Sequence, residues 1–396
     1  MKDRGNITWL VGEGAPQARP MAPYNALACD FLHDLSETLR ASKEASNHAD
    51  IMTFAFWCRK GHVHALKDHF EDGRVRLGLG LALHITPGNV PINFAFSFAF
   101  GLLSGNTNIV RVPTKPAPQT DLVCNAVKDL LTQKKYEELQ SMTSFVRYAQ
   151  NDDITREFSK SSHARLIWGG NETIRTIRSL PSPERCVDLT FADRYSFCVL
   201  DAASVEALGD KDLNTLVKGF YNDTYLMDQN ACSSPHLVVW LGENTEKAKT
   251  KFWKALSALV RETYNLEPVH AVDKYTQLCR NAIDLDHIKD VDWSDTGVFR
   301  VGLTHLDKKV DERRGRCGYF YECDLAELSP LAEIINSAYQ TLTYFGVDKE
   351  KLQELVCTGR VTGVDRIVPV GMGLEIGVVW DGYDVVRSLS RIIDLR

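Results

Sequence analysis

Several signals that mark other classes of protein are missing from this sequence. Its ten cysteines include no Cys-x-x-Cys pair, and its first residues, MKDRGNITWL, lack the apolar core of a signal peptide, so we expect a reduced, cytoplasmic protein. The most apolar stretch, 94–103, has ten residues where a bilayer requires ~20, so no membrane span is expected. The formal net charge is only -6, which gives no long-range attraction to a polyanion, so no nucleic-acid partner is expected.

The chain has the size and composition of a globular protein with two domains. Its 396 residues exceed what one core usually holds, and 44% of them are hydrophobic and 25% charged. From residue 75 onward, short β-rich segments alternate with helical segments, which is the pattern of a parallel sheet with crossover helices. The sequence therefore predicts an α/β fold of the nucleotide-binding type, with a domain boundary near residues 194–200.

The expected elements follow from the spacing of apolar residues. Helical spacing covers 24–39 and 51–70, ahead of the alternation. The first cycle has strands at 81–86, 108–112, 144–148, 164–168 and 186–190 and helices at 91–103, 120–132, 154–159 and 172–179. The second cycle has strands at 195–200 and 236–241 and helices at 213–225 and 246–264.

Asn89 lies in a turn that two prolines and a glycine make rigid. In His84-Ile-Thr-Pro-Gly-Asn89-Val-Pro91 a strand ends, and a helix begins near Pro91, where a missing N–H costs little. An amide held at such a point can donate a hydrogen bond to a developing oxyanion, which lowers a barrier by ~2.7–4 kcal/mol. The commoner role of a turn asparagine is to satisfy its own backbone.

Two further segments lie at the carboxyl ends of predicted strands, which is where open α/β sheets bind their ligands. Arg111, at the end of the strand at 108–112, and Lys115, beyond it, could meet a phosphate or could be ordinary exposed charges. Gly169 and Gly170 join a strand to a helix start, where an anion is favoured. The spacing is not that of a complete Gly-x-Gly-x-x-Gly motif, and such corners are often only tight turns.

Cys232 is the strongest candidate for a nucleophile. It stands in Asp228-Gln-Asn-Ala-Cys232-Ser-Ser-Pro235, among small and polar residues after a helix and ahead of a strand, so it is better placed for access than for core packing. The other nine cysteines mostly have bulky apolar neighbours, as buried structural thiols do.

Two other groupings stay without an assigned function. Cys58, His62, His64 and His69 fall within one helical stretch with interleaved basic residues, which is more typical of a solvated helix face than of a zinc site, so no metal is assigned. Phe94, Phe96, Phe98 and Phe100 could line an acyl tunnel, but alternating positions within a helix cannot all point to one side, and core packing explains most of them better.

The motifs at Asn89, Arg111, Gly169-Gly170 and Cys232 together resemble those of the aldehyde dehydrogenase superfamily. Within it, the chain is most similar to the LuxC-like fatty acyl-CoA reductases of bacterial bioluminescence. Further matches are Phe56-Trp-Cys-Arg-Lys60, Tyr339-Gln340-Thr-Leu342 and Trp380-Asp-Gly-Tyr383. The resemblance starts near residue 20 and implies two Rossmann-type parallel-sheet domains with a cleft between them. It implies an N-terminal and NADP-binding region at 1–195, a catalytic domain at 196–370 and a C-terminal segment at 371–396.

The resemblance also implies roles for single residues. Cys232 matches the family's thiolate nucleophile, and Asn89 matches its oxyanion donor, with the Cys232 main-chain N–H as the second donor. Arg111 stands where the superfamily has a lysine on the adenosine ribose, and Gly169 and Gly170 match the helix start at the cofactor pyrophosphate.

The expected cofactor is NADPH. Thr114 occupies the position at which NAD-preferring members have a glutamate on the ribose 2′-hydroxyl. With no carboxylate there and with Arg111 and Lys115 nearby, a 2′-phosphate can be accepted. Glu327 resembles the glutamate that holds the nicotinamide ribose, although the neighbouring Glu322 and a plain surface position are alternatives.

The implied reaction is the reduction of a fatty acyl-CoA or acyl thioester to an aldehyde through a thioacyl-cysteine. Oxidising members hydrolyse that intermediate with a glutamate base, whereas the matching stretch here, Asp188-Leu-Thr-Phe-Ala-Asp193, has no glutamate. Asp188 or Asp193 could replace it, so an aldehyde dehydrogenase that makes free acids is an alternative, as is a non-catalytic acyl-binding scaffold. The resemblance further implies an acyl-protein synthetase as partner and a homo-oligomer.

Overall fold

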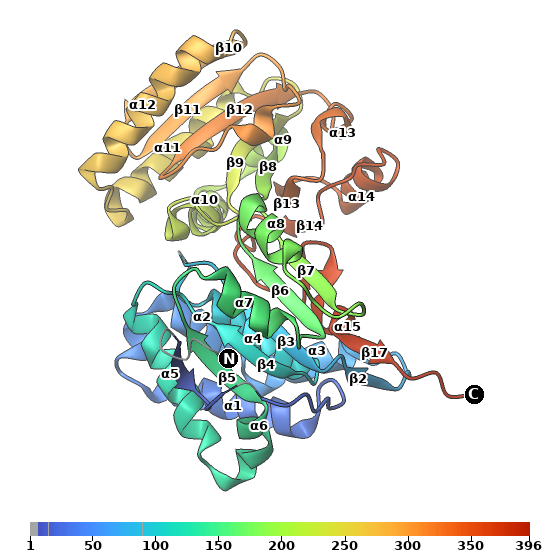
Figure 1. Ribbon diagram of the computed structural model, residues 1–396. Coiled ribbons are helices and arrows are strands. Elements are labelled where there is room, and N and C mark those ends of the chain that lie inside the picture. The colour runs from blue at the N-terminus through green and yellow to red at the C-terminus, as the bar shows by residue number, and fades with distance from the viewer. Residues whose placement is uncertain (1–6, 15, 89) are drawn as a thin grey trace. The chain divides into compact units, whose positions relative to one another are not determined.

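The computed structural model describes residues 7–14, 16–88 and 90–396. The chain divides into two compact units (Figure 1). Unit 1 comprises residues 1–192 together with 378–396, and unit 2 comprises residues 193–377. The final segment thus returns to the unit in which the chain begins, so unit 2 is inserted into unit 1.

Unit 1 is built on a sheet of order β1-β5-β4-β3-β6-β7, which is parallel except for the antiparallel edge strand β1. The strands of unit 1 up to residue 192 are β1 (Thr8–Val11), β2 (Arg76–Gly78), β3 (Leu81–Ile85), β4 (Thr107–Arg111), β5 (Thr143–Arg147), β6 (Ala164–Trp168) and β7 (Val187–Phe191), of which β2 lies outside this sheet. Its helices up to residue 192 are α1 (Ala26–Ala41), α2 (Ala49–Trp57), α3 (Lys60–Phe70), α4 (Asn93–Leu103), α5 (Pro118–Leu131), α6 (Glu137–Ser141), α7 (Asp152–Ser159) and α8 (Asn171–Ser179), with short 3-10 turns η2 (Ala45–Asn47) and η3 (Lys134–Tyr136).

Helices cover both faces of this sheet, so its strands are apolar on both sides. On one face, side chains from β3, β4, β5 and β6 pack with those of α7 and α8 in one buried cluster. On the other face, the helix α4 is buried along almost its whole length: Phe94 and Phe98 meet the Phe145 ring edge to face, and Phe96 and Phe100 meet Trp57. The four phenylalanines therefore pack in the core.

Unit 2 has a seven-stranded sheet of order β10-β11-β12-β9-β8-β13-β14, in which β10 alone runs antiparallel. The strands are β8 (Tyr195–Asp201), β9 (Pro235–Leu241), β10 (Ile288–Asp295), β11 (Val298–Leu303), β12 (Tyr319–Leu325), β13 (Tyr339–Phe345) and β14 (Arg366–Pro369). The helices are α9 (Ala202–Ala207), α10 (Asp210–Thr224), α11 (Glu246–Thr263), α12 (Pro268–Asp284), α13 (Leu331–Ile334) and α14 (Lys349–Cys357), with 3-10 turns η4 (Tyr225–Met227) and η5 (Val310–Glu312).

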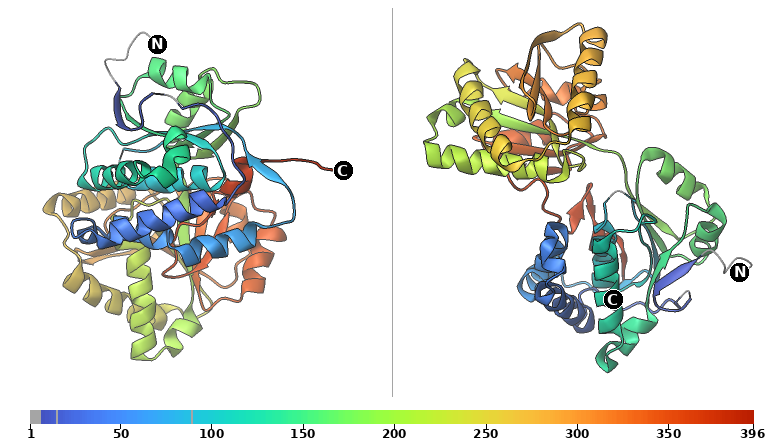
Figure 2. Two further views of the ribbon diagram at one scale, coloured as in Figure 1. Left: turned by 90° about the horizontal axis from the view of Figure 1, so that it is seen from below. Right: turned by 90° about the vertical axis from the view of Figure 1, so that its left-hand side faces the viewer.

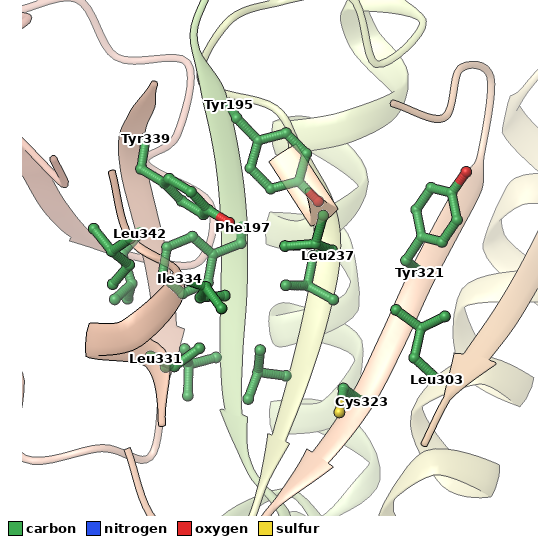
Figure 3. Close-up of a cluster of buried hydrophobic side chains, with 14 of the residues drawn as sticks. Tyr195, Phe197, Leu237, Leu303, Tyr321, Cys323, Leu331, Ile334, Tyr339 and Leu342 are labelled. Atoms are coloured by element: carbon green, nitrogen blue, oxygen red, sulfur yellow. The ribbon is translucent and has the colours of Figure 1, made fainter. Parts of the chain in front are cut away.

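Side chains of unit 2 alternate between two cores, one on each face of the sheet. Along β8, Phe197 and Val199 enter the cluster that Figure 3 shows, together with residues of α12, α13 and α14. Cys198 and Leu200 enter the opposite cluster with residues of α9, α10 and α11. Burial of apolar surface contributes ~25 cal/mol for each Å², so these two clusters stabilise the sheet from both faces. The ends of its strands therefore hold side chains in defined positions.

The C-terminal segment adds its own elements to unit 1. They are β15 (Val379–Trp380), β16 (Tyr383–Asp384), α15 (Val385–Ser388) and β17 (Ser390–Ile392). β17 pairs antiparallel with β2, which lies beside it in Figures 1 and 2. The Asn106 side chain donates a hydrogen bond of 2.9 Å to the Leu389 carbonyl and ties the segment to the start of β4. Among the described residues, no helix combines the length and apolar character needed to cross a membrane.

Candidate active site

Cys232 lies in a tight turn directly ahead of β9, at the edge of unit 2 where the parallel strands begin. Three other polar residues share this edge because they stand at or near the start of neighbouring strands: Ser196 on β8, Gln340 on β13 and Arg366 on β14. The sheet order places β9, β8, β13 and β14 side by side, so residues distant in sequence are gathered around one thiol.

The turn that carries Cys232 is anchored by Gln229. Asp228 and Gln229 have positive φ angles of 50° and 60°, a conformation that side chains rarely adopt without support from their surroundings. The fully buried Gln229 amide supplies that support. Its Nε2 donates to the carbonyls of Pro235 and Tyr319 at 2.9 and 3.0 Å, and its Oε1 accepts from the N–H groups of Gly318 and Tyr319 at 3.1 Å each.

Further hydrogen bonds fix both ends of this turn. The Tyr264 hydroxyl donates to the Asp228 carboxylate at 2.6 Å, and the Cys317 N–H donates to the Asp228 carbonyl at 3.1 Å. The Ser234 hydroxyl donates to the main-chain carbonyl of Asp223 on α10 at 2.7 Å. The segment 228–234 is therefore held by β9, β12 and α10 at once.

The Cys232 side chain is half-buried, and described polar groups contact it at the sulfur and at the carbonyl. The Gln340 amide Nε2 donates to Sγ at 3.2 Å. The Ser196 hydroxyl donates to the Cys232 carbonyl at 2.7 Å. The same hydroxyl accepts a hydrogen bond of 3.1 Å from the N–H of Thr341, so Ser196 links the thiol-bearing turn to β13.

Charged groups behind this thiol form a network with the loop at 370–376. Burial lowers the pKa of Arg366 from its usual value, while Glu375, Asp223 and the Cys232 thiolate act in the opposite direction, which places Cys232 within electrostatic range of the guanidinium. Arg366 donates to the carbonyls of Gly373, Met372 and Glu375 at 2.7 Å each.

Asp223 closes the network from α10. Its buried carboxylate accepts hydrogen bonds from the main-chain N–H groups of Gly371 and Gly373 at 2.6 and 2.7 Å. Burial raises the pKa of Asp223 to about 6, against the lowering effect of these two bonds and of Arg366. The Cys232 edge is thus polar and contains a permanent cation, and both properties favour a thiolate.

The remaining cysteines differ from Cys232 in their surroundings. Burial raises the pKa of the Cys29 and Cys323 thiols to about 11 and of the Cys124 thiol to about 12. Cys58, Cys198 and Cys317 are also buried, Cys186 is half-buried, and Cys279 and Cys357 are exposed. The expectation of buried thiols is therefore wrong for Cys279 and Cys357. Cys317 also has the Tyr264 hydroxyl and the Lys274 ammonium beside its sulfur, but it is buried and burial raises the pKa of its thiol, whereas Cys232 is half-buried.

In unit 1, the predicted cofactor residues follow the carboxyl ends of neighbouring strands. The chain runs from β3 outward to β5 in one direction and then crosses to β6 and β7 on the other side of β3, so the order reverses between β3 and β6. Open α/β sheets bind ligands at such a switch point. Gly88 follows β3, and Gly169 and Gly170 follow β6, so these turns flank the switch point directly. Asn89 lies outside the described residues.

Arg111 ends β4, one strand from the switch point. Its guanidinium lies 4.8 Å from the centre of the Tyr148 ring and donates to the Tyr148 carbonyl at 3.4 Å. The Thr114 hydroxyl donates to the same carbonyl at 3.3 Å, which brings Arg111 and Thr114 together. Among the described residues, the buried Nε of Arg111 has no hydrogen-bond partner. Lys115 is exposed.

Gly170 is the N-cap of α8, and no side chain caps this helix start. The first-turn N–H groups of an uncapped helix can bind an anion, although Glu172 places a carboxylate in the same turn. Gly169 uses its own N–H to donate to the Phe191 carbonyl at 3.2 Å and so joins β6 to β7.

Three other predicted residues lie away from these two edges. Glu327 is exposed, follows the carboxyl end of β12 and accepts from the Ser329 hydroxyl at 2.7 Å; the structure places it at the end of the unit 2 strands opposite to Cys232. Asp188 lies near the start of β7, and its carboxylate accepts hydrogen bonds of 2.7 Å each from Nε and Nη2 of the buried Arg165. Asp193 is an exposed residue of unit 2.

The histidine-rich stretch is divided between two helices. His62 and His69 use their Nδ1 atoms on the carbonyls of Trp57 and Ala65, each at 2.7 Å, and Cys58 is buried. Within the described part of the chain, histidine, cysteine and carboxylate side chains nowhere gather in a group of three or more that could hold a metal ion.

Sequence reasoning missed Ser196, Asp223 and Arg366 as part of the site. Gln340 belonged to a quoted motif but had no assigned role. A signal was available for Asp223, since an aspartate on the buried face of a helix needs partners for its charge. The other residues stand at strand starts, and only the sheet order shows that these starts are neighbours.

Comparison with known proteins identifies the family of the chain. Residues 64–393 match the family described as acyl-CoA reductase (LuxC). The chain belongs to the LuxC family. The family prediction from the sequence is thereby confirmed.

Curated relatives in this family are named long-chain acyl-protein thioester reductases. The protein of Photorhabdus luminescens is 23% identical over 318 residues, which cover 79% of this chain and 62% of the relative. That of Vibrio harveyi is 21% identical over 314 residues, covering 79% of this chain and 63% of the relative. This LuxC family chain therefore spans somewhat less than two thirds of the length of these relatives.

Solved structures establish the fold. A benzaldehyde dehydrogenase of Corynebacterium glutamicum superimposes with a TM-score of 0.62 at 11% identity, over 94% of this chain and 85% of that one. A salicylaldehyde dehydrogenase of Pseudomonas putida G7 gives a TM-score of 0.62 at 14% identity, over 92% and 84% of the two chains. This LuxC family member has the α/β fold of aldehyde dehydrogenases, as predicted.

Proposed function

We propose that this protein reduces a long-chain acyl thioester to the aldehyde, with Cys232 as the nucleophile. The observation that carries the proposal is the half-buried Cys232 thiol with the Gln340 amide on its sulfur and Arg366 in electrostatic range, at the edge of the unit 2 sheet. The family match and the names of the curated relatives support the reaction class.

In the proposed reaction, the Cys232 thiolate attacks the acyl carbonyl carbon. A bond forms between Sγ and this carbon, and the oxyanion collapses to expel the donor thiol as a thiolate, which leaves a thioacyl group on Cys232. Asn89 and the main-chain N–H of Cys232 are the proposed donors to the oxyanion. After reduction, release of the aldehyde restores the Cys232 thiolate.

The proposed reductant is a nicotinamide cofactor, specifically NADPH, held at the switch point of unit 1. When bound, it would supply the hydride that converts the thioacyl group to the aldehyde. Arg111, whose Nε has no hydrogen-bond partner in the described part of the chain, and the Thr114 hydroxyl fit a 2′-phosphate, and Lys115 adds a positive charge to the same stretch. The uncapped start of α8 after Gly170 fits the pyrophosphate. Glu327 stays a prediction as a ribose contact.

Reduction is favoured over hydrolysis to a free acid because the Asp188 carboxylate is engaged in an ion pair. Its carboxylate is occupied by Arg165 in a two-point ion pair, so it is poorly suited to activate water. The acyl donor is proposed to be a fatty acyl-CoA or an acyl group carried on a protein thiol. A synthetase that supplies this donor is part of the same proposal.

Mass spectrometry of the protein after incubation with a long-chain acyl-CoA, without NADPH, tests this function. We expect a mass increase of one acyl group, located on the peptide that contains Cys232 and absent in Cys232→Ala. Addition of NADPH to the acylated protein should release aldehyde and restore the original mass. Cys357→Ser, which removes an exposed thiol, is the matched control and should acylate normally. Failure of Cys232 to acylate, or release of free acid, would reject the reductase.

A further inference from the structure

Two irregularities in the unit 2 sheet flank Ser196, next to Cys232. On β13, Gln340 and Thr341 together face the single residue Ser196, because Tyr339 pairs with Tyr195 and Leu342 with Phe197. On β9, His236 is the extra residue between the pairs Ser196–Pro235 and Phe197–Leu237. A β-bulge of this kind turns the side chains of the bulged strand away from their regular alternation.

The bulge on β13 is stabilised by the hydroxyl of Ser196. The Thr341 N–H donates to Ser196 Oγ, in place of a regular ladder carbonyl, at 3.1 Å. The same hydroxyl donates a hydrogen bond of 2.7 Å to the Cys232 carbonyl. The bulged strand and the thiol-bearing turn are therefore coupled through one side chain.

The Gln340 amide is oriented so that its nitrogen faces the sulfur. The Thr341 hydroxyl donates to Gln340 Oε1 at 3.1 Å, which occupies the oxygen side of the amide. Nε2, which carries the two hydrogens, lies 3.2 Å from Cys232 Sγ, a normal distance for a hydrogen bond to sulfur. Gln340 is itself almost fully buried, so this contact is shielded from water.

We propose that Gln340 is a positioning residue for the nucleophile: its amide N–H fixes the Cys232 side chain in one orientation and stabilises the thiolate over the thiol. A hydrogen bond donated to the charged form of a group favours that form, and bonds to charged groups are stronger than neutral ones. This role deepens the proposed function, since it rests on Cys232 as the nucleophile.

Other charges near Cys232 in unit 2 remain unchanged when Gln340 is replaced. Arg366 from β14 favours the thiolate, and Asp223 from α10 and Glu375 from the following loop are the other anions that interact with this guanidinium. Arg194, paired with Asp365, donates to the Tyr339 carbonyl beside Gln340 at 2.6 Å. A shift caused by Gln340→Leu can therefore be assigned to the loss of one amide donor.

The test is the rate of Cys232 alkylation by iodoacetamide as a function of pH, read from the Cys232 peptide by mass spectrometry. Gln340→Leu keeps the size and removes the donor, so its midpoint should move about one pH unit upward, with about a tenfold lower rate at pH 7 and a similar rate at the high-pH plateau. Gln340→Glu keeps the shape but places a carboxylate against the sulfur, so its midpoint should lie above that of Gln340→Leu.

Gln277→Leu is the matched control, because this half-buried glutamine of unit 2 donates to Asn281 Oδ1 instead of a thiol; its profile should equal that of the wild type. An unchanged midpoint in both Gln340 variants would overturn the positioning role, as would a lower plateau without a shift, which signals only altered access. The assay uses no acyl donor and no NADPH. A shifted midpoint together with failed acylation would therefore reject the reductase and keep the role of Gln340. An unchanged midpoint together with normal acylation of Cys232 would keep the reductase and reject the role of Gln340.

Discussion

Ser196 and Cys232 are joined by a hydrogen bond of 2.7 Å from the serine hydroxyl to the cysteine carbonyl, across 36 positions in the sequence. The same hydroxyl accepts from Thr341, so the initial parts of two strands and the turn ahead of a third are connected through it. A thiol on a turn would otherwise move with that turn. This relationship ties the carbonyl of the candidate nucleophile to two strands of the unit 2 sheet.

Replacing this serine should loosen the thiol. In Ser196→Ala, the buried N–H of Thr341 and the Cys232 carbonyl both lose their hydrogen bond to this hydroxyl, which should lower the free energy of unfolding by about 1–3 kcal/mol. Urea unfolding of the full chain measures this change, and amide hydrogen exchange in the peptide that covers 228–235 should become faster. Ser329→Ala, at an exposed serine, should change stability by no more than about 0.5 kcal/mol. Equal stabilities of the two variants would contradict the linking role.

Asp223 should make stability depend on pH. Because its folded-state pKa, about 6, lies above the usual 3.8, the folded state binds a proton between these values that the unfolded state does not. The stabilising contribution is therefore complete below about pH 4 and is lost as the pH rises to about 6, by up to about 3 kcal/mol. The stability of the wild type relative to Asp223→Asn should fall over this range in urea titrations. Asp212→Asn, on the exposed start of α10, should leave the slope unchanged, and a parallel pH course for Asp223→Asn would refute the prediction.

Thr114 should control the choice between the two nicotinamide cofactors. Thr114→Glu places a carboxylate beside Arg111, and it should weaken binding of NADPH by about tenfold or more through repulsion of the 2′-phosphate. Binding of NADH should change little. Fluorescence titration with each cofactor measures the two affinities, and Thr38→Glu, at an exposed site on α1, controls for the added charge. Equal weakening of NADPH and NADH would show that Thr114 does not face the 2′ position.

Asp188 should act as a structural anion, not as a catalytic base. Arg165 is buried, and Asp188 is its ionic partner through two hydrogen bonds, so Asp188→Asn leaves an uncompensated charge and should cost about 3–5 kcal/mol of stability. Removal of the exposed pair partner in Asp153→Asn should cost less than about 1 kcal/mol. Thermal unfolding of both variants measures the contrast. An Asp188→Asn protein of normal stability that has lost activity would instead favour a base.

The sequence predicted the regular part of the fold well because buried parallel strands and their crossover helices have a strong apolar pattern. The strand at 164–168 was predicted with the bounds it has in the structure. The strand expected at 81–86 ends one residue earlier, and the one expected at 186–190 is displaced by one residue. The helix expected at 51–70 is two helices, since Arg59 has an extended ψ of 142° and starts α3 as its N-cap. Apolar spacing continued across this break and concealed it.

The region after residue 264 could not be predicted because its pattern is weak. In α12, the buried residues are Lys274, Leu278 and Asn281, while Val272 and Ile283 are exposed, so the usual relation between polarity and burial is reversed. Lys274 is buried because its ammonium group donates to the carbonyls of Thr296 and Cys317 at 2.7 and 2.8 Å. Such partners come from other elements and leave no local signal.

Only those parts of the candidate site that have a signal in the local sequence could be predicted. Cys232 could be selected because its neighbours are small and polar. Gln340, by contrast, is 108 positions away and reaches the sulfur through a bulge, and a bulge depends on strand register, which one sequence does not reveal.

The pairing of β2 with β17 has a consequence for synthesis on the ribosome. β17 is made about 300 residues after β2, which at 5–20 residues per second corresponds to a delay of roughly 15–60 s. The whole inserted unit emerges and can fold within that interval, while the nascent first unit still lacks one hydrogen-bonded neighbour. Termination of synthesis before β17 would therefore leave β2 as an open edge, a template for aggregation between unfinished chains.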